Sequence, residues 1–265
     1  MLIVTGKAPT RLDLSGGTLD MWPIHQLLQQ PLTINLSVNL TAHVTLSLGS
    51  QSDFFFVSQD QNRSLSGNFD KVTQDTKTLP LISLMVKNLW DKTLPPIRIE
   101  TNALSPKGAG LGGSSSLSIV IAACLWTARN QLDPQFAIYQ DTDLRRLAGD
   151  LEAQLIKAPT GCQDYWAALK GGINMISYPP GSEVVESLTL SSFRELEDEM
   201  IIWYSGVSRD SAMNNWQIYK QFFEGHKETL TLFHQITDTS KKIKEAGMSS
   251  IVDLKNHNLN YKIRE

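Results

Sequence analysis

A glycine- and serine-rich segment in the middle of the chain has the residues best suited to chemistry. Four glycines precede three serines and an apolar stretch with helical spacing, and these glycines are Gly108, Gly110, Gly112 and Gly113. Because glycine permits positive φ angles and close backbone approach, several N–H groups of such a loop can face one anion. A following helix adds the positive end of its dipole. The segment therefore predicts a cradle for nucleotide phosphates, with serine hydroxyls as ligands for Mg²⁺ or phosphate oxygens.

Known phosphate loops offer three interpretations of this segment. A Walker A loop requires a lysine where Ser114 stands. The dinucleotide fingerprint Gly-x-Gly-x-x-Gly is matched literally, but it needs a strand directly before it and an acidic residue closing a second strand. The candidate strand Ile97–Thr101 ends too far upstream, and the residues near Asp133 are typical of a turn between helices. The third pattern, Pro-x-x-x-Gly-Leu-Gly-x-Ser, begins at Pro106, and a plain surface linker would not explain its apolar flanks.

A second segment, near the N-terminus, combines a cation, a glycine turn and a carboxylate. Arg11 offers a rigid, permanently charged donor fork for phosphate, and Asp20 can accept hydrogen bonds from two sugar hydroxyls. Gly16, Gly17 and Thr18 lie between them. The segment is compatible with a polyhydroxy ligand, but an ordinary glycine turn with solvated charges explains it as well.

A third segment contains two carboxylates twelve residues apart. Glu152 borders the buried face of a predicted helix, where a carboxylate needs a partner or a metal ion. Asp164 falls in the first turn of a short predicted helix that is opened by Pro-Thr-Gly and closed by Gly171. Glycines on both sides suggest a backbone folded tightly around a ligand. The alternative for Asp164 is a carboxylate that satisfies backbone donors at a helix N-terminus.

Hydrophobic periodicity predicts the elements that must position these residues. Strands are expected at Leu2–Thr5, Arg11–Leu14, Leu40–Leu48, Ile97–Thr101, Gly172–Ser177, Val184–Leu190 and Met200–Tyr204. Helices are expected at 81–89, from about 115 to 128, at 144–155, and as a pair between about 210 and 246. Strands and helices are mixed without strict alternation, which favours an α+β fold. We expect a domain boundary in the turn-rich segment 179–199.

Composition narrows the class of protein. The chain has 265 residues and a net charge of −3, without the basic runs that nucleic-acid binding requires. Its two cysteines, Cys124 and Cys162, have no metal-type spacing, so reduced thiols are expected. The longest apolar run, residues 117–126, is too short to span a bilayer, and no secretory signal is visible. We therefore expect a cytoplasmic protein that binds neither nucleic acid nor membrane.

Taken in order, the three segments resemble the GHMP kinase superfamily (galactokinase, homoserine kinase, mevalonate kinase, phosphomevalonate kinase) over residues 1–177. Ala8-Pro9-x-Arg11, Gly161-x-Gln163-Asp164 and the motif Ser205–Ser211 are similar to the branch that phosphorylates heptose 7-phosphate and fucose. The resemblance implies a ribosomal-protein-S5-like N-terminal domain over residues 1–190 and the start of a ferredoxin-like domain over residues 191–265. It also implies ATP and Mg²⁺ as cofactors and transfer of the γ-phosphate to a sugar or sugar phosphate, specifically to the anomeric hydroxyl of a heptose 7-phosphate. A homo-oligomer is possible.

The resemblance also implies roles for individual residues. Asp164 matches the catalytic aspartate, Arg11 the residue that stabilises charge beside it, and Ser114 and Glu152 the metal ligands. Residues expected to bind the nucleotide are Pro106, Lys107, Gly108, Ala109, Gly110, Leu111, Gly112, Gly113, Ser114, Ser115 and Ser116. Residues expected to bind the acceptor are Gly16, Gly17, Thr18, Asp20, Gly161, Gln163 and Arg209.

The sequence departs from the family pattern in two places. Gly113 replaces the first of two loop serines, which removes a hydroxyl but leaves the backbone. The C-terminal motif Lys-x-x-Gly-Ala-Gly-Gly-Gly is missing, because the glycines after Gly181 are isolated. Truncation and divergence both explain this gap. Two alternatives therefore stay open: a non-catalytic sensor of sugar or nucleotide, and a kinase for a non-sugar alcohol such as mevalonate.

Overall fold

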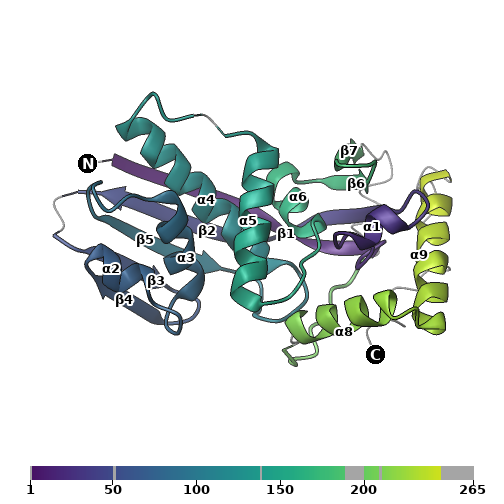
Figure 1. The fold of residues 1–265 in the computed structure, drawn as a ribbon. Helices are drawn as coiled ribbons and strands as arrows, with labels where there is room; N and C mark the ends of the chain where they lie inside the picture. Colours follow the sequence, from purple (N-terminus) through teal and green to yellow (C-terminus); the bar gives the residue numbers. More distant parts are fainter. Residues whose placement is uncertain (1, 50–51, 138, 189–199, 209–210, 246–265) are drawn as a thin grey trace. The chain divides into compact units, whose positions relative to one another are not determined.

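The computed structural model describes residues 2–49, 52–137, 139–188, 200–208 and 211–245, with strands and helices in mixed order (Figure 1). The chain divides into two compact units, each built from separate stretches of sequence. The first unit comprises Met1–Thr10, Asn39–Lys107 and Gly112–Lys157. The second comprises Arg11–Val38, Gly108–Leu111 and Ala158–Glu265. The expected α+β class is confirmed. The domain boundary expected near residue 190 stays a prediction.

A mixed sheet forms the first unit. Its central strand β5 (Ile97–Ala103) pairs antiparallel with the second half of β2 (Leu32–Leu48) and parallel with β3 (Phe54–Ser58). β3 in turn pairs antiparallel with β4 (Arg63–Gly67), which gives the order β4-β3-β5-β2. A fifth strand, β1 (Leu2–Ser15), pairs with β2.

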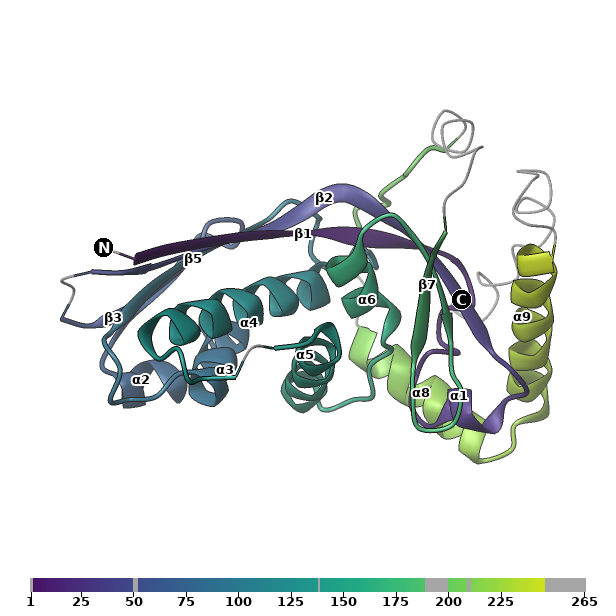
Figure 2. The same cartoon turned by 90° about the horizontal axis from the view of Figure 1, so that it is seen from above.

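Helices of the first unit cover one face of these strands (Figure 2). Alternate side chains of a strand point to the same face of a sheet. Phe56, Ile97 and Ile99 point to the covered face and are fully buried. On the helix that follows the glycine loop, Ile121 and Leu125 are also fully buried. The covering helices are α2 (Phe69–Thr73), α3 (Pro80–Leu89), α4 (Gly113–Leu132) and α5 (Asp141–Ile156).

The second unit combines a three-stranded antiparallel arrangement with short and long helices. Residues 32–36 of β2 pair with β6, and β6 pairs with β7. The two long C-terminal helices, α8 and α9, meet at a corner (Figure 1). Leu19, Met21 and Ile24 pack with Phe222 and Phe233 of these helices, which anchors the segment that follows the N-terminal glycine turn. The elements not yet given are α1 (Ile24–Leu27), α6 (Gln163–Lys170), β6 (Ile173–Ser177), β7 (Val184–Leu188), α8 (Ser211–Phe223) and α9 (Lys227–Glu245).

The structure corrects the strand predictions in four places. β2 begins at Leu32, well before the strand predicted at Leu40–Leu48. β1 is one continuous strand through Pro9, where the sequence predicted two; it pairs with β2 off the main path of the sheet, and an edge strand tolerates proline. The strand predicted at Met200–Tyr204 is wrong: these residues form no regular structure, and Trp203 is 87% exposed. β3 and β4 were not predicted.

The predicted helices are all found, as α3, α4, α5, α8 and α9, and the strands predicted at 172–190 form the hairpin β6–β7. Asp164 lies in the first turn of α6, as predicted, and Gly171 ends that helix. Among the described residues, no helix has both the length and the apolarity needed to cross a lipid bilayer.

Candidate active site

An ion pair between buried Arg11 and partly buried Asp164 forms the centre of the candidate site in the second unit. Arg11 lies on β1, Asp164 lies in the first turn of α6, and Nε and Nη2 of the arginine both lie 2.6 Å from Oδ1 of the aspartate. The remaining terminal nitrogen, Nη1, donates to the carbonyl oxygen of Gly110 at 2.6 Å. The backbone N–H of Arg11 donates to the carbonyl of Leu111. One arginine therefore holds both the predicted catalytic carboxylate and the backbone of the glycine loop.

Carboxylates around Arg11 keep its side chain charged. Burial by itself lowers the pKa of this guanidinium, but Asp164, Asp13 and Asp20 outweigh that effect and raise the pKa above its ordinary value. No role was predicted for Asp13. A signal was present, because residues two apart on a strand lie on the same face, as Arg11 and Asp13 do.

Asp20 is buried and ties two segments of the second unit together. Its Oδ1 accepts a hydrogen bond from the N–H of Thr18 at 3.1 Å, and its Oδ2 accepts one from the N–H of Gln163 at 2.9 Å. Burial raises the pKa of this carboxyl to about 6; the hydrogen bond from Gln163 lowers it, and the charges of Asp164 and Asp13 raise it further. The predicted contact between Asp20 and a sugar stays a prediction.

The N-terminal glycines form a tight turn beside this carboxylate. Gly16 has a φ of +86°, and a Cβ there would lie 2.0 Å from the carbonyl oxygen of Leu32, so only glycine fits. The N–H of Gly17 donates to Asp13 Oδ1, and Thr33 Oγ1 donates to the carbonyl of Gly16. The backbone of the turn is thus held by side chains of β1 and β2.

Gln163 presents a buried carbonyl oxygen. The residue is 2% exposed, and its side-chain Oε1 has no hydrogen-bond partner in the part of the chain that the structure describes. Buried polar atoms are nearly always paired, so an unpaired one next to a catalytic candidate needs an explanation. A hydroxyl of a bound ligand would be a suitable partner, and the substrate role of Gln163 stays a prediction.

The glycine loop has the backbone conformation that its sequence predicts. Gly108, Gly110 and Gly112 have φ angles of +73°, +74° and +73°, which favour glycine. Gly112 is the N-cap of α4, and the bond from the N–H of Ser116 to the Gly112 carbonyl is the first of that helix. The N–H groups of residues 113–115 precede this bond and are therefore the donors that a helix offers to an anion. The hydroxyl of Ser116 lies 2.7 Å from the carbonyl of Pro9 in β1.

In the first unit, the predicted metal ligand Glu152 is paired with a loop serine. Its Oε2 accepts a hydrogen bond from Ser115 Oγ at 2.9 Å, and both residues are buried. Ser114, the serine predicted to bind metal, is exposed. A carboxylate and a hydroxyl are hard oxygen donors that suit Mg²⁺, which keeps several waters and substrate oxygens in its coordination sphere. The donor set thus fits Mg²⁺, although the described residues contain no cluster of three or more metal-binding side chains.

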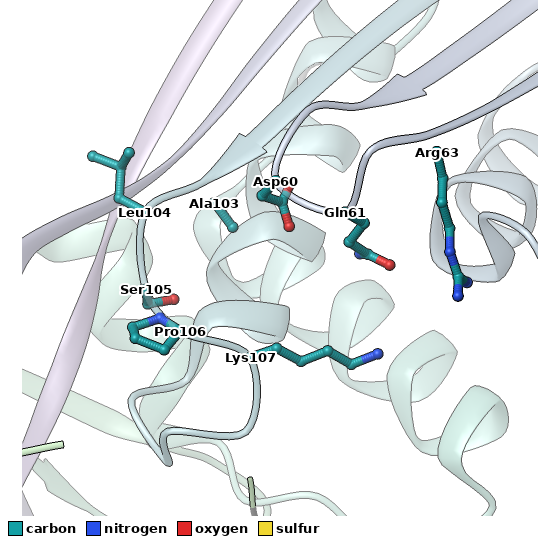
Figure 3. A pocket seen from close by; sticks show the side chains of 8 residues that line it. All are labelled: Asp60, Gln61, Arg63, Ala103, Leu104, Ser105, Pro106 and Lys107. Atoms are coloured by element: carbon teal, nitrogen blue, oxygen red, sulfur yellow. The ribbon is translucent and has the colours of Figure 1, made fainter. Parts of the chain in front are cut away.

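A cavity of about 430 Å³ in the first unit adds residues that sequence analysis missed. Lys107, Gln61 and Arg63 direct their polar ends toward the same space (Figure 3). The cavity is continuous in sequence with the glycine loop, because Lys107 directly precedes Gly108. Its full lining is Asp60, Gln61, Arg63, Ala103, Leu104, Ser105, Pro106 and Lys107. No local motif marks residues 60–63, since they approach the loop only through the pairing of β3 with β5.

Comparison with known proteins gives a family match for the central part of the chain. Residues 80–172, which include the glycine loop, Glu152 and Asp164, match the family model described as the GHMP kinases N terminal domain. This part of the chain is a GHMP kinase N-terminal domain.

One curated relative and several solved structures are similar to most of the chain. The chain is 25% identical over 254 residues to the D-glycero-alpha-D-manno-heptose 7-phosphate kinase of Campylobacter jejuni, covering 93% of this chain and 72% of the relative. A crystal structure of a D-glycero-D-manno-heptose 1-phosphate kinase from Bacteriodes thetaiotaomicron is 22% identical with a TM-score of 0.72, covering 97% of this chain and 76% of that one. Streptococcus pneumoniae phosphomevalonate kinase, solved with phosphomevalonate and AMPPNP, is 11% identical with a TM-score of 0.68, covering 98% and 79%.

Two further site predictions concern Arg209 and Gly161. Arg209 lies outside the described residues. The preceding part of its motif, residues 205–208, is exposed. Gly161 is close to the other site residues, because a Cβ at this position would lie 2.1 Å from Asp20 Oδ2.

Proposed function

We propose that the protein is an ATP-dependent kinase that transfers the γ-phosphate to a sugar or sugar phosphate. The observation that carries the proposal is the double engagement of Arg11, which binds Asp164 Oδ1 and the Gly110 carbonyl of the glycine loop. A phosphoryl-transfer site requires positive charge and positioning between the nucleotide phosphates and the attacking group. Arg11 meets both requirements.

Asp164 is the group that receives the proton in this proposal. Among the described residues, no hydrogen bond reaches its second oxygen, Oδ2, because Arg11 engages Oδ1. The acceptor hydroxyl attacks the γ-phosphorus, the new O–P bond forms, the bond to the leaving ADP oxygen breaks, and the hydroxyl proton passes to Asp164 Oδ2. Arg11 holds Asp164 through Oδ1 and balances negative charge near the reacting oxygen.

The nucleotide is proposed to lie on the glycine loop, with its base or ribose in the cavity lined by Gln61, Arg63 and Lys107. The α4 N-terminus and the positive φ angles of the loop glycines support the phosphate assignment. Glu152 with Ser114 or Ser115 would hold Mg²⁺. The ion would neutralise phosphate charge when bound.

The acceptor is proposed to be a seven-carbon sugar phosphate, phosphorylated at its anomeric hydroxyl. The names of the Campylobacter jejuni and Bacteriodes thetaiotaomicron relatives support this class. The orphaned Gln163 Oε1, buried beside Asp164, is suited to accept a sugar hydroxyl. A cytoplasmic location and self-association remain predictions.

A coupled assay of ADP release tests the proposal. The purified protein is incubated with Mg-ATP and, separately, heptose 7-phosphate, fucose, galactose, mevalonate and homoserine. We expect turnover with heptose 7-phosphate above all others. Activity confined to mevalonate or homoserine would refute the sugar assignment, and sugar binding by calorimetry without ADP release would favour the sensor.

A further inference from the structure

The peptide backbone of Gln163, directly before Asp164, is held from both sides by side chains of other segments. Its N–H donates to Asp20 Oδ2 at 2.9 Å, and its carbonyl accepts from Asn35 Nδ2 at 3.2 Å. Asp20, Asn35 and Gln163 are all buried. The residue that carries the reacting carboxylate therefore follows a backbone position fixed at both its polar groups.

A second asparagine fixes Asn35 itself. Asn35 on β2 lies opposite Asn174 on β6 in the strand register, and both are 0% exposed. Asn174 Nδ2 donates to Asn35 Oδ1 at 3.2 Å and to the carbonyl of Gly171 at 3.0 Å, while Ser187 Oγ donates to Asn174 Oδ1 at 3.3 Å. Polar side chains are buried at a large cost in free energy unless they are hydrogen-bonded. This network orients Asn35 toward α6.

Asp20 performs the task that a capping residue usually performs. The N-cap of α6 is Cys162, whose side chain makes no capping hydrogen bond. The first helical N–H, that of Gln163, instead finds its acceptor in the distant carboxylate of Asp20, and a carboxylate is favourable at this end of a helix. Gly161 provides the space, because a Cβ there would overlap Asp20 Oδ2.

From these contacts we infer that Asn35 and Asp20 are positioning residues, which set the place of Asp164 by holding the Gln163 peptide. The inference rests on the proposed function, in which Asp164 accepts the proton of the attacking hydroxyl. A misplacement of a reacting group by about 1 Å can lower the rate about 100-fold. Loss of either contact would let the first turn of α6 move.

The chain offers a matched control on the same strand and the same helix. Ser37, two residues after Asn35 on β2, donates through Oγ to the carbonyl of Ala167 at 3.2 Å. This bond also anchors α6, with the same length as the bond from Asn35, but one turn further from Asp164. A general loss of helix anchoring would appear in both variants, whereas a loss of Asp164 positioning appears only in the Asn35 variant.

Steady-state kinetics of Asn35→Ala and Ser37→Ala test the inference. We expect kcat of Asn35→Ala to fall by about 100-fold with the KM for ATP unchanged, and kcat of Ser37→Ala to fall by less than about twofold. Equal losses in the two variants, or an unchanged kcat in Asn35→Ala, would overturn the inference. If Asn35→Ala does not fold, Asn174→Ala removes the support of Asn35 one bond further away and replaces it in the comparison.

Amide hydrogen exchange gives a readout that does not depend on activity. We expect the exchange of the Gln163 amide to accelerate about tenfold or more in Asp20→Asn and Asn35→Ala, but not in Ser37→Ala. A wild-type protein that transfers no phosphate to any acceptor would refute the proposed function, and the exchange rates would still decide whether the peptide is held. Unchanged exchange at Gln163 in both variants would refute the positioning itself.

Discussion

Two nitrogens of Arg11 contact the same carboxylate oxygen of Asp164: Nε and Nη2 both lie 2.6 Å from Oδ1. An arginine that faced both oxygens would occupy the whole carboxylate. This one-sided arrangement leaves Oδ2 clear of the guanidinium. In the proposed mechanism, Oδ2 is therefore the atom of Asp164 that the acceptor hydroxyl approaches.

Asp164→Asn is expected to abolish most transfer while ATP affinity stays unchanged. The amide keeps the shape of the side chain but cannot accept a proton, and loss of a general base lowers rates by roughly 10²–10⁴-fold. Single-turnover phosphate transfer and calorimetric ATP titration measure the two effects. A decrease of less than about tenfold in turnover would assign Asp164 a purely structural role at the α6 terminus.

Gly110→Ala is expected to weaken ATP binding. Its φ of +74° strains any residue with a Cβ, although a Cβ at this position would have no atom within 4 Å in the protein. Loss of one backbone–phosphate hydrogen bond, about 1.5 kcal/mol, corresponds to about a tenfold higher Kd for ATP.

Gly225→Ala is the control for this substitution, because Gly225 has a φ of +72° and equally open surroundings. Both variants are expected to lose roughly 1–2 kcal/mol of stability from the left-handed backbone. Only Gly110→Ala is expected to lose ATP affinity. Similar ATP affinities in the two variants would show that the phosphates of ATP do not bind to this loop.

The side chain of Ser105 leaves little room for a serine at position 113, where this chain has Gly113. A Cβ at Gly113 would lie 2.3 Å from Ser105 Oγ, so Gly113→Ser is expected to destabilise the protein and Ser105→Gly to reverse the effect. The interaction energy in this double-mutant cycle is expected to be about 1 kcal/mol or more. Urea denaturation of the four proteins measures it, and additive effects would show that the hydroxyl moves aside freely.

Glu152→Gln is expected to weaken Mg²⁺ binding. The substitution removes the charge that favours a divalent cation, so the Mg²⁺ concentration for half-maximal activity should rise about tenfold or more. Calorimetry of Mg-ATP against ATP alone provides a readout besides activity. Asp150→Asn, on the exposed side of α5, is the matched control. An equal effect of this variant on Mg²⁺ binding would show that Glu152 is not a metal ligand.

Stability should fall with rising pH through the titration of Asp20. Burial raises the pKa of this carboxyl from 3.8 to about 6, so between about pH 4 and 6 the folded state binds more protons than the unfolded state. The facing groups are Asp164 and Asp13, which raise this pKa, and Arg11, which lowers it. The difference corresponds to roughly 3 kcal/mol, present below pH 4 and lost above pH 6.

Comparison with Asp20→Asn isolates this contribution, because the other carboxylates titrate in both proteins. We expect the stability of wild type relative to the variant to decrease between pH 4 and pH 7 in chemical denaturation. A difference that is constant over this range would show that Asp20 titrates normally.

Local sequence signals were sufficient for some parts of the site. Glycines on both sides of α6 marked its limits, and therefore the place of Asp164 in its first turn. At Gly171 the helix ends with a positive φ angle that favours glycine. The glycine loop was predictable for a similar reason, because positive φ angles at Gly108, Gly110 and Gly112 are open to glycine.

Other parts depended on contacts between distant segments. Ser115, not Ser114, pairs with Glu152, and this choice is set by the rotation of α4 relative to α5. The continuity of β1 through Pro9 is set by its pairing with β2. The apolar pattern at Met200–Tyr204 indicates a strand, but a strand needs a neighbour to accept its backbone hydrogen bonds, and none pairs with it among the described residues. Such partners are invisible in a single sequence.

Arg11 donates hydrogen bonds both to Asp164 and to the carbonyl of Gly110, and this has a thermodynamic consequence. A nucleotide that shifts the loop must also shift the guanidinium, and with it the carboxylate that meets the acceptor. The two substrates are therefore expected to bind with a coupling free energy, and linkage requires that each alters the affinity of the other by the same factor. This coupling through a single side chain can be measured as synergy between nucleotide and acceptor binding, whichever of the two binds first.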